Sequence, residues 1–496
     1  MDASGRRVLA EAVAKVRNSM EQTPGYTEAY AFFIQRHPSY AETASLDELR
    51  AADYARLDRL GHIYLDYTGG ALYPESLLRE HFEFLTANVL GNPHSHNPTS
   101  AASTSLVEEA REAMLSFFGA SRDEYEVIFT ANASSALKLV GEAYPFEPSG
   151  HLLLSYDNHN SVNGIREFAR SRGAMVTYVP VRNPELRLDE GLLMEALAQP
   201  ASGDRRLFAY PAQSNFSGVQ HPLEWVEAAH DRGWDVLLDC AAYVPTNRLD
   251  LRTVKPDFVA LSVYKMIGYP TGIGALLARR DALAKLGRPW FAGGTISLAS
   301  VQGEGWHHLA PAPAGYEDGT VNYLGLPAVT MGLEFLDSIG IETIHRRVMI
   351  LTEWLLEEMG ALRHGNGAPM VRFFGPRDTA LRGATVAFYL LDPAGRVYDV
   401  YGIEALAGSV HISLRTGCFC NPGDGEVAHE IEPEEMAPCF EGSRALVTFE
   451  QCYRIIQDAT GKVPNTVRVS LGLASNFADV LRFMGFLAGF KDVTAS

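Results

Sequence analysis

A series of short, continuous apolar segments separated by amphipathic stretches constrains the fold most strongly. The segments are rich in Val, Leu, Ile and aromatic residues, and the stretches between them, such as LEWVEAAHDRG, have helical spacing. Strands that are apolar on both faces form mainly parallel sheets covered by helices on both sides. We therefore expect an α/β fold with a mainly parallel seven-stranded sheet between helices, its strands at 126–130, 151–155, 176–180, 206–210, 235–239, 258–262 and 274–278.

The chain has 496 residues, which is too many for one compact core, and its pattern changes twice. Residues 1–55 have apolar positions at helical spacing, for instance in VLAEAVAKV and YTEAYAFFI. Long helical stretches followed by mixed segments begin near residue 336. We expect an N-terminal helical segment (1–55) that packs on the small domain, a large cofactor-binding domain (56–335) and a smaller α+β C-terminal domain (336–496).

The charge and the cysteine content limit which classes of partner and which cellular compartment are expected. The net charge of −18 argues against nucleic acid or an anionic membrane as the main partner, because both require clustered cations. The first 22 residues lack the continuous apolar region of a signal peptide. Five cysteines in so long a chain suit free thiols in a reducing compartment better than a disulfide framework. We expect a cytoplasmic protein.

Asp239 and Lys265 each follow an apolar strand. Strand ends of the same sense share one edge of a parallel sheet, where ligands bind, so the two side chains are expected to face one crevice. Pyridoxal 5'-phosphate requires this pair, with a lysine as its Schiff-base anchor and a carboxylate that keeps the pyridine nitrogen protonated. A solvated lysine after a strand is the alternative for Lys265 taken alone.

The segment FTANASSALKLV predicts a strand followed by a helix whose N-terminus could hold a phosphate. Asn132, Ala133 and Ser134 lie at that helix start, and Ser262 and Tyr264 could add hydroxyl groups from beside the lysine. The alternative is that Ser134 is only an N-cap.

Other candidate residues lie in loops or on a short strand. His159 could stack on the cofactor ring or relay protons, and Asn215 could donate to its phenolic oxygen. Arg468 could bind a substrate carboxylate, although a structural salt bridge would serve equally well.

The loop LRTGCFCNPG places Cys418 and Cys420 beside Arg415. A thiolate near this positive charge would be a good nucleophile. Two ordinary buried thiols are the rival interpretation. No second cysteine pair or Cys–His pair has metal-ligand spacing, so we expect no metal site.

Several motifs together resemble the class V aminotransferase superfamily, and within it the cysteine-desulfurase-like domain of the molybdenum cofactor sulfurases. The specific segments are SVYKMIGYPTG and RTGCFCNPG, and further similar stretches extend from about residue 60 to 480. The resemblance implies the pyridoxal-phosphate-dependent transferase fold of type I. The longer eukaryotic members carry a further C-terminal domain that handles molybdopterin, for which 496 residues leave no room.

The resemblance also implies a role for each matching position. Lys265 would anchor the cofactor, Asp239 would pair with its pyridine nitrogen, and His159 would stack on its ring. The phosphate would be held by Asn132, Ala133, Ser134, Ser262 and Tyr264, and by Thr320 of a second subunit in a homodimer. Asn215 would contact both the cofactor oxygen and the substrate, and Arg468 the substrate carboxylate.

Cys420 aligns with the persulfide-forming cysteine of this family. The implied activity is removal of sulfur from L-cysteine as a Cys420 persulfide, which passes to an acceptor molecule or protein, in this family the molybdenum cofactor. The third cysteine expected shortly after Cys420 is missing, and Ala242 and Tyr264 replace a glutamine and a histidine of simpler desulfurases. A β-eliminating C–S lyase and a catalytically silent scaffold are the rival functions.

Overall fold

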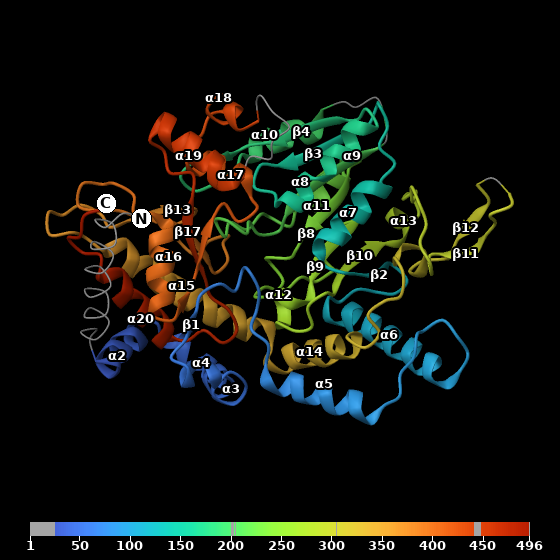
Figure 1. Cartoon of the computed structure of the whole chain (residues 1–496), viewed down its shortest axis with the longest axis horizontal. Helices are drawn as coiled ribbons and strands as arrows, with labels where there is room; N and C mark the ends of the chain where they lie inside the picture. Colours follow the sequence, from blue (N-terminus) through green and yellow to red (C-terminus); the bar gives the residue numbers. More distant parts are fainter. Residues whose placement is uncertain (1–24, 200–202, 204, 304, 441–447, 496) are drawn as a thin grey trace.

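The computed structural model describes residues 25–199, 203, 205–303, 305–440 and 448–495. A seven-stranded sheet forms its centre (Figure 1), in the order β2 (Tyr125–Thr130), β10 (Gly274–Arg279), β9 (Phe258–Ser262), β8 (Asp235–Asp239), β7 (Arg206–Pro211), β3 (His151–Ser155) and β4 (Met175–Val179). Strand β10 is antiparallel to both of its neighbours, and the other pairs are parallel. The predicted α/β class is confirmed, and each of the seven strands begins and ends within one residue of its predicted position.

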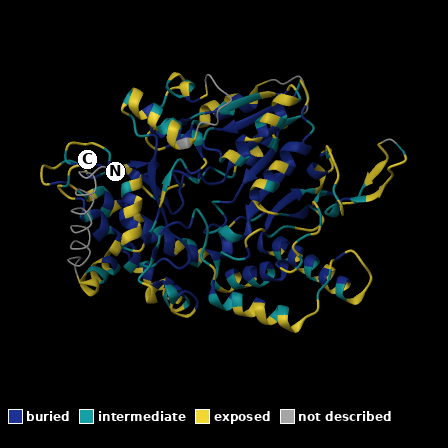
Figure 2. Cartoon of the chain, in the orientation of Figure 1, coloured by how far each residue is buried: buried dark blue, intermediate teal, exposed yellow. Residues whose placement is uncertain are grey.

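Successive residues of a strand face opposite layers, which explains why the inner strands carry apolar residues on both sides. In β8, Val236 and Leu238 join the hydrophobic cluster on one face of the sheet, whereas Leu237 joins the cluster on the other. The first face is covered by α6 (Pro98–Phe117), α10 (Glu190–Ala198), α11 (Trp225–His230) and α14 (Leu326–Ile339), and the second by α7 (Ala133–Ala143) and α9 (Ile165–Ser171). The strands are accordingly buried throughout the centre of Figure 2.

The edge of the sheet that carries the candidate residues is set by strand direction. Gly274, at the start of antiparallel β10, lies opposite both Thr130 and Ser262, at the ends of β2 and β9. Asp239 ends β8, the next strand along. Loops that leave these strands therefore meet at one edge, as expected for ligand sites in such sheets.

A second, four-stranded antiparallel sheet lies in the C-terminal part, in the order β13 (Val371–Phe374), β14 (Thr385–Leu390), β17 (Thr466–Ser470) and β16 (Arg415–Gly417). Its cluster includes side chains of α15 (Ile341–Ala361), α16 (Val400–Ser409) and α20 (Phe477–Ala488), and also Phe33 and Tyr40 from the N-terminal segment. Leu46 and Tyr54 of the same segment join the hydrophobic cluster of the large sheet instead. The division into an N-terminal segment (1–55) that packs on the small domain, a large domain (56–335) and a small domain (336–496) stays a prediction. The predicted helix in VLAEAVAKV lies outside the described residues.

The remaining helices and strands lie outside these two sheets and the helices named above. They are α2 (Tyr26–Arg36), η1 (Pro38–Thr43), α3 (Ser45–Asp53), α4 (Arg56–Arg59), β1 (Ile63–Tyr64), α5 (Glu75–Ala87), α8 (Asn160–Asn163), β5 (Val181–Arg182), β6 (Arg187–Leu188), α12 (Val263–Ile267), α13 (Arg280–Leu283), β11 (Ile296–Ala299), β12 (His307–Leu309), η2 (Ala314–Tyr316), β15 (Ile412–Ser413), α17 (Pro422–Ala428), α18 (Pro433–Met436), η3 (Ala437–Cys439) and α19 (Phe449–Thr460). Hairpin β11–β12 projects from the body at the right of Figure 1. Across the described ranges, no helix combines the length and the apolar character needed to cross a membrane.

The expectation that all cysteines are free thiols is wrong for one pair. Cys439 and Cys452 form a disulfide, whereas Cys240, Cys418 and Cys420 are free. The two bonded residues lie only 13 positions apart, in η3 and α19, and the pairing depends on how those short elements fold together.

Candidate active site

A cavity of about 240 Å³ lies at the edge of the large sheet where β8 and β9 end. Asp239 and Lys265 both line it, as do most of the other residues predicted for the cofactor. The described lining consists of Asn132, Ala133, Ser134, Leu137, His159, Ser161, Pro211, Gln213, Asn215, Asp239, Ala241, Ala242, Ser262, Tyr264 and Lys265. Residues from five separate segments of the chain thus meet around one space.

The charges in this cavity interact with one another. Burial lowers the pKa of Lys265, and the Asp239 carboxylate only partly opposes this effect. Burial also lowers the pKa of His159, on which Asp239 and Lys265 act in opposite directions. Asp239 itself is buried and accepts a hydrogen bond of 3.0 Å from the Ala241 backbone N–H. A lysine with a lowered pKa has more of the uncharged amine, which is the nucleophilic form.

The N-terminus of α7 forms one end of the cavity. The Ala133 N–H donates to Ser262 Oγ at 2.9 Å, and Ser134 Oγ lies 2.6 Å from Ser161 Oγ. Asn132 caps the helix by accepting from the Ser135 N–H at 3.0 Å. A Cβ on Gly274 would approach Asn132 C to 2.4 Å, so this close contact requires glycine. Helix dipole, hydroxyl groups and backbone N–H groups suit a phosphate.

Thr320 lies in the wall of a neighbouring cavity of about 280 Å³, together with Ser135 and Gly272. Its predicted contact with the phosphate of a second subunit stays a prediction. Ser262 and Tyr264 line the main cavity beside Lys265, as the sequence predicts.

Arg468 is buried on β17 and contacts an acidic partner that the sequence analysis did not identify. Its Nη2 donates to Asp66 Oδ1 at 2.9 Å and its Nη1 to the Asn215 backbone oxygen at 2.8 Å, while its Nε has no partner among the described atoms. Burial lowers the pKa of Arg468 to about 10, and Asp66 opposes this shift. A guanidinium has five N–H donors, so Arg468 retains donors for a carboxylate.

Arg415 also binds Asp66, through Nε and through Nη2 at 2.6 Å. The sequence placed this guanidinium beside the loop cysteines as a possible activator of a thiolate. In the structure Arg415 forms an ion pair with Asp66. Asp66 also pairs with Arg468, so the three residues form one ion-pair network.

The cysteine loop lies against the large domain at the cavity edge. Asn160, directly after His159, donates its N–H to the Cys420 oxygen at 2.7 Å. Asn215 Nδ2 donates to the Phe419 oxygen at 2.7 Å, and the Phe419 ring lies under the Arg468 guanidinium, 4.4 Å from its centre. Cys420 is exposed, and both Phe419 and Cys420 have positive φ (55° and 57°).

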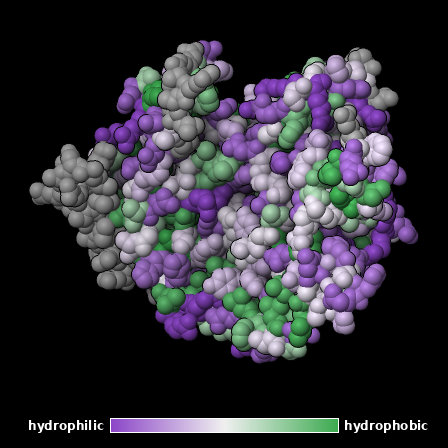
Figure 3. Space-filling view, turned by 45° about the vertical axis from the view of Figure 1, so that its right-hand side comes forward, coloured by the Kyte–Doolittle hydropathy of each residue, from purple (hydrophilic) through white to green (hydrophobic). Residues whose placement is uncertain are grey.

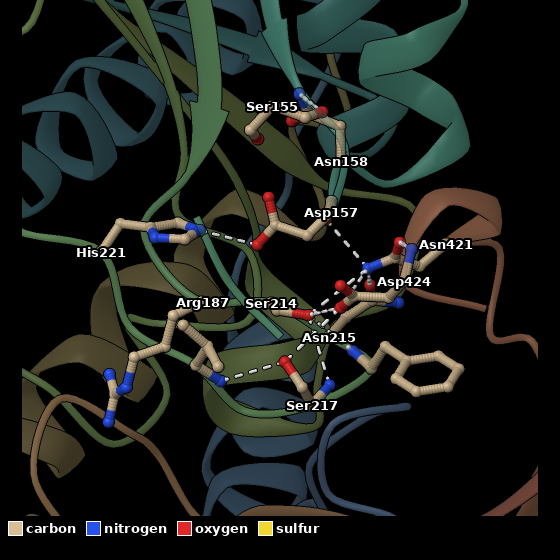
Figure 4. A network of polar contacts seen from close by, with 12 residues as sticks. Ser155, Asp157, Asn158, Arg187, Ser214, Asn215, Ser217, His221, Asn421 and Asp424 are labelled. Carbon is tan, nitrogen blue, oxygen red and sulfur yellow. Dashed lines mark hydrogen bonds and ion pairs between the residues drawn. The ribbon is translucent and has the colours of Figure 1, made fainter. Parts of the chain in front are cut away.

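A buried polar network fixes the other side of this loop (Figure 4). Asn421 Nδ2 donates to the Asp157 backbone oxygen at 2.8 Å, and Ser214 Oγ donates to Asp424 Oδ2 at 2.6 Å. Asp157 Oδ2 lies 2.6 Å from His221 Nε2. Oδ1 of Asp157 and Oδ1 of Asp424 are buried without a partner among the described atoms. Burial, together with the charge of Asp157, raises the pKa of Asp424 well above its usual range.

Replacing Asp424 with Asn is expected to stabilise the protein by about 1–3 kcal/mol at pH values where the folded-state carboxyl group is ionised, because a buried carboxylate with an unpaired oxygen is costly and the amide carries no charge. The folded chain binds a proton at Asp424 more tightly than the unfolded chain, so wild-type stability falls as pH rises through this raised pKa. Urea unfolding between pH 5 and pH 9 measures the difference. The exposed Asp123→Asn is the control, and a gain of D424N that is equal at all pH values would contradict the assignment.

Three residues of the site were missed in the sequence. Asp66 follows strand β1 and carries a signal similar to that of Asp239, an acidic residue after an apolar segment. Gln213 lines the cavity, and Ser161 contacts Ser134, but polar residues in loops of this kind are too common to single out.

Comparison with known proteins agrees with this geometry. The sequence model of the family Aminotransferase class-V matches residues 63–483. The chain is 33% identical over 479 residues to molybdenum cofactor sulfurase of Arabidopsis thaliana, covering 89% of this chain and 58% of that protein. It is 35% identical over 487 residues to the Homo sapiens protein of the same name, covering 93% and 54%. The chain therefore spans somewhat more than half the length of these relatives.

A solved structure has the same fold. The cysteine desulfurase of Thermococcus onnurineus superposes with a TM-score of 0.71 at 23% identity, covering 89% of this chain and 97% of that one. This match supports the transferase-type α/β architecture of the chain.

Proposed function

Because this chain belongs to the aminotransferase class-V family, we propose that it binds pyridoxal 5'-phosphate in the cavity between Asp239 and Lys265 and removes sulfur from L-cysteine. The observation that carries the proposal is the arrangement of four features around one cavity. These are a lysine with a lowered pKa, a buried carboxylate and the N-terminus of α7, with a cysteine loop at the rim.

The residues of the cavity fit this cofactor at each of its ends. Ser262, Ser134 and the N-terminus of α7 would hold the phosphate, and Asp239 would hold the proton on the pyridine nitrogen. The bound cofactor supplies an electron sink for the carbon atoms of an amino acid. Lys265 would anchor it covalently and, once released, would move the proton from the substrate α-carbon. His159 would cover the face of the ring.

The substrate would be oriented by Arg468, whose remaining donors suit an α-carboxylate, and by Asn215. The Cys420 thiolate would then attack the substrate sulfur. The new S–S bond forms as the bond between substrate Cβ and sulfur breaks, and Cβ gains the electron pair and a proton, so that alanine leaves.

Analysis of the products formed from L-cysteine tests this proposal. The wild-type holoenzyme should yield alanine and a protein persulfide at position 420. The Cys420→Ser variant should keep the yellow absorbance of lysine-bound cofactor while persulfide formation is lost, because only the sulfur nucleophile is missing. Full-rate desulfuration by C420S would exclude this role for Cys420.

A β-eliminating C–S lyase is the second candidate, since the same cavity could serve it and Cys420 lies at the exposed rim instead of in the cavity. Such an enzyme would release pyruvate and ammonia and would not depend on Cys420. A silent scaffold would bind no cofactor, and its protein would remain colourless after incubation with pyridoxal phosphate.

The proposal also includes a sulfur acceptor, which by analogy with the molybdenum cofactor sulfurases is a molybdenum cofactor, and a cytoplasmic homodimer. Exposed apolar side chains support self-association. Phe82 of α5 and Val89, two residues after this helix ends, are exposed. Figure 3 shows a hydrophobic patch at the lower edge of the molecule. Leu298, Val301 and Trp306 are exposed on the projecting hairpin. Sedimentation of the holoenzyme would determine its oligomeric state.

A further inference from the structure

The cysteine loop has a second cavity, which the proposed chemistry does not use. It has a volume of about 290 Å³ and lies among α17, α18, η3 and α19. Cys418 lines it, and so does the Cys439–Cys452 disulfide. The other described lining residues are mostly apolar: Asn160, Pro422, Gly425, Glu426, Ile431, Met436, Phe440, Thr448, Tyr453, Ile456 and Pro464. This space is called the Cys418 pocket below.

The two loop thiols differ in environment. Cys420 is exposed, whereas Cys418 is half-buried in the wall of the Cys418 pocket. Only Phe419 separates them, and its left-handed backbone turns the chain between them. A sulfur atom on Cys420 would be open to water, while one on Cys418 would be in apolar surroundings.

The loop backbone is held in place on the large domain. Asn215 binds the Phe419 oxygen, Asn160 binds the Cys420 oxygen, and Asn421 binds the Asp157 oxygen, at 2.7–2.8 Å. Carrying a persulfide away by movement of the whole loop would break all three hydrogen bonds. Transfer of the sulfur between two side chains of the loop would break none of them.

We propose that Cys418 is a second sulfur carrier, which takes the outer sulfur of a Cys420 persulfide and holds it in the Cys418 pocket. The proposal rests on the proposed desulfurase function. The Cys418 thiolate attacks the outer sulfur of Cys420–S–SH, forming a new S–S bond as the old one breaks. The electron pair of the broken bond leaves with Cys420, which becomes a thiolate again. The exchange needs no oxidant or reductant.

An exit route adjoins the pocket. A hollow of about 730 Å³ on the outside of α17 and α18 shares Glu426, Ile431, Met436 and Phe440 with the Cys418 pocket. The described lining of this hollow shares no residue with that of the cofactor cavity, so an acceptor could approach Cys418 through it while Cys420 is reloaded.

Peptide mass spectrometry after a single turnover of the holoenzyme with L-cysteine tests the proposal. Rapid alkylation should trap sulfur first on Cys420 and later on Cys418, and fragment ions between the two residues distinguish them. Cys418→Ser should retain the Cys420 persulfide and lose the later signal, and Cys420→Ser should carry sulfur at neither position. Buried Cys240 is the internal control.

Sulfur on Cys420 alone at all times would overturn the relay and leave the proposed function intact. Sulfur on neither cysteine in the wild type would overturn both. Loading of Cys418 in the Cys420→Ser variant would overturn the order of transfer and hence the relay.

The pH dependence of sulfur transfer from Cys420 to Cys418 provides a further test, because a purely structural role of Cys418 would not produce it. Burial raises the pKa of Cys418, an effect that the Cys420 N–H opposes and the nearby Cys420 and Glu426 side chains support. Tyr453 of α19 also lines the pocket. The Cys418 thiolate is therefore scarce at neutral pH, and its transfer rate should rise about tenfold per pH unit up to that pKa. A transfer rate that does not change between pH 7 and pH 9 would overturn the relay.

Discussion

Replacing Lys265 with Ala is expected to remove the yellow absorbance of the holoenzyme and to lower turnover of L-cysteine by at least about 10²–10⁴-fold, the usual contribution of a general acid or base. Lys265 lines the cavity, and burial lowers the pKa of its amine, which favours the uncharged, nucleophilic form. The variant would still bind the cofactor phosphate at α7, so cofactor would be retained only reversibly. Absorbance after gel filtration and alanine release measure the two effects.

Lys138→Ala is the matched control. This lysine belongs to α7, whose N-terminus lines the cavity, but its side chain is 62% exposed and pairs with Glu142. The substitution should leave both absorbance and turnover near wild-type values. Undiminished activity of K265A, or an equal loss in K138A, would contradict the role of Lys265.

The positions of the strands and their burial on both faces could be predicted because each strand carries its own sequence signal. A five-residue apolar run such as FVALS specifies a strand buried on both faces, whatever follows it. Lys265 and Asp239 could be predicted for the same reason, since Asp239 ends one such strand and Lys265 follows the end of its neighbour in the sheet by three residues. Local sequence and sheet direction were sufficient to place them at one edge.

Contacts between distant segments could not be predicted in this way. Asp66 and Arg468 are separated by 402 positions, and nothing near either residue specifies the other. The same holds for Asp424, which meets Ser214 only because α17 docks on the large domain. Arg415 illustrates the consequence, because its neighbours in sequence are the cysteines but its partner in space is Asp66.

The Asp66 network leads to the second large expected effect. Replacing Asp66 with Ala should lower the free energy of unfolding by about 3–5 kcal/mol, because removing one partner of a buried ion pair leaves an uncompensated charge. Arg468, whose side chain is 2% exposed, would lose the only carboxylate it contacts among the described residues. Urea unfolding of the purified variant measures the loss.

Arg415→Ala is the control that separates the two ion pairs of this network. The Arg415 side chain is 50% exposed, so its pair with Asp66 is screened by solvent and its removal should cost only about 0–1 kcal/mol. Asp66 would still be held by Arg468 in that variant. Equal losses in D66A and R415A would show that Asp66 does not act mainly through buried Arg468. A loss in D66A alone would show that Asp66 stabilises the fold mainly through buried Arg468, at the site where we propose the substrate carboxylate binds.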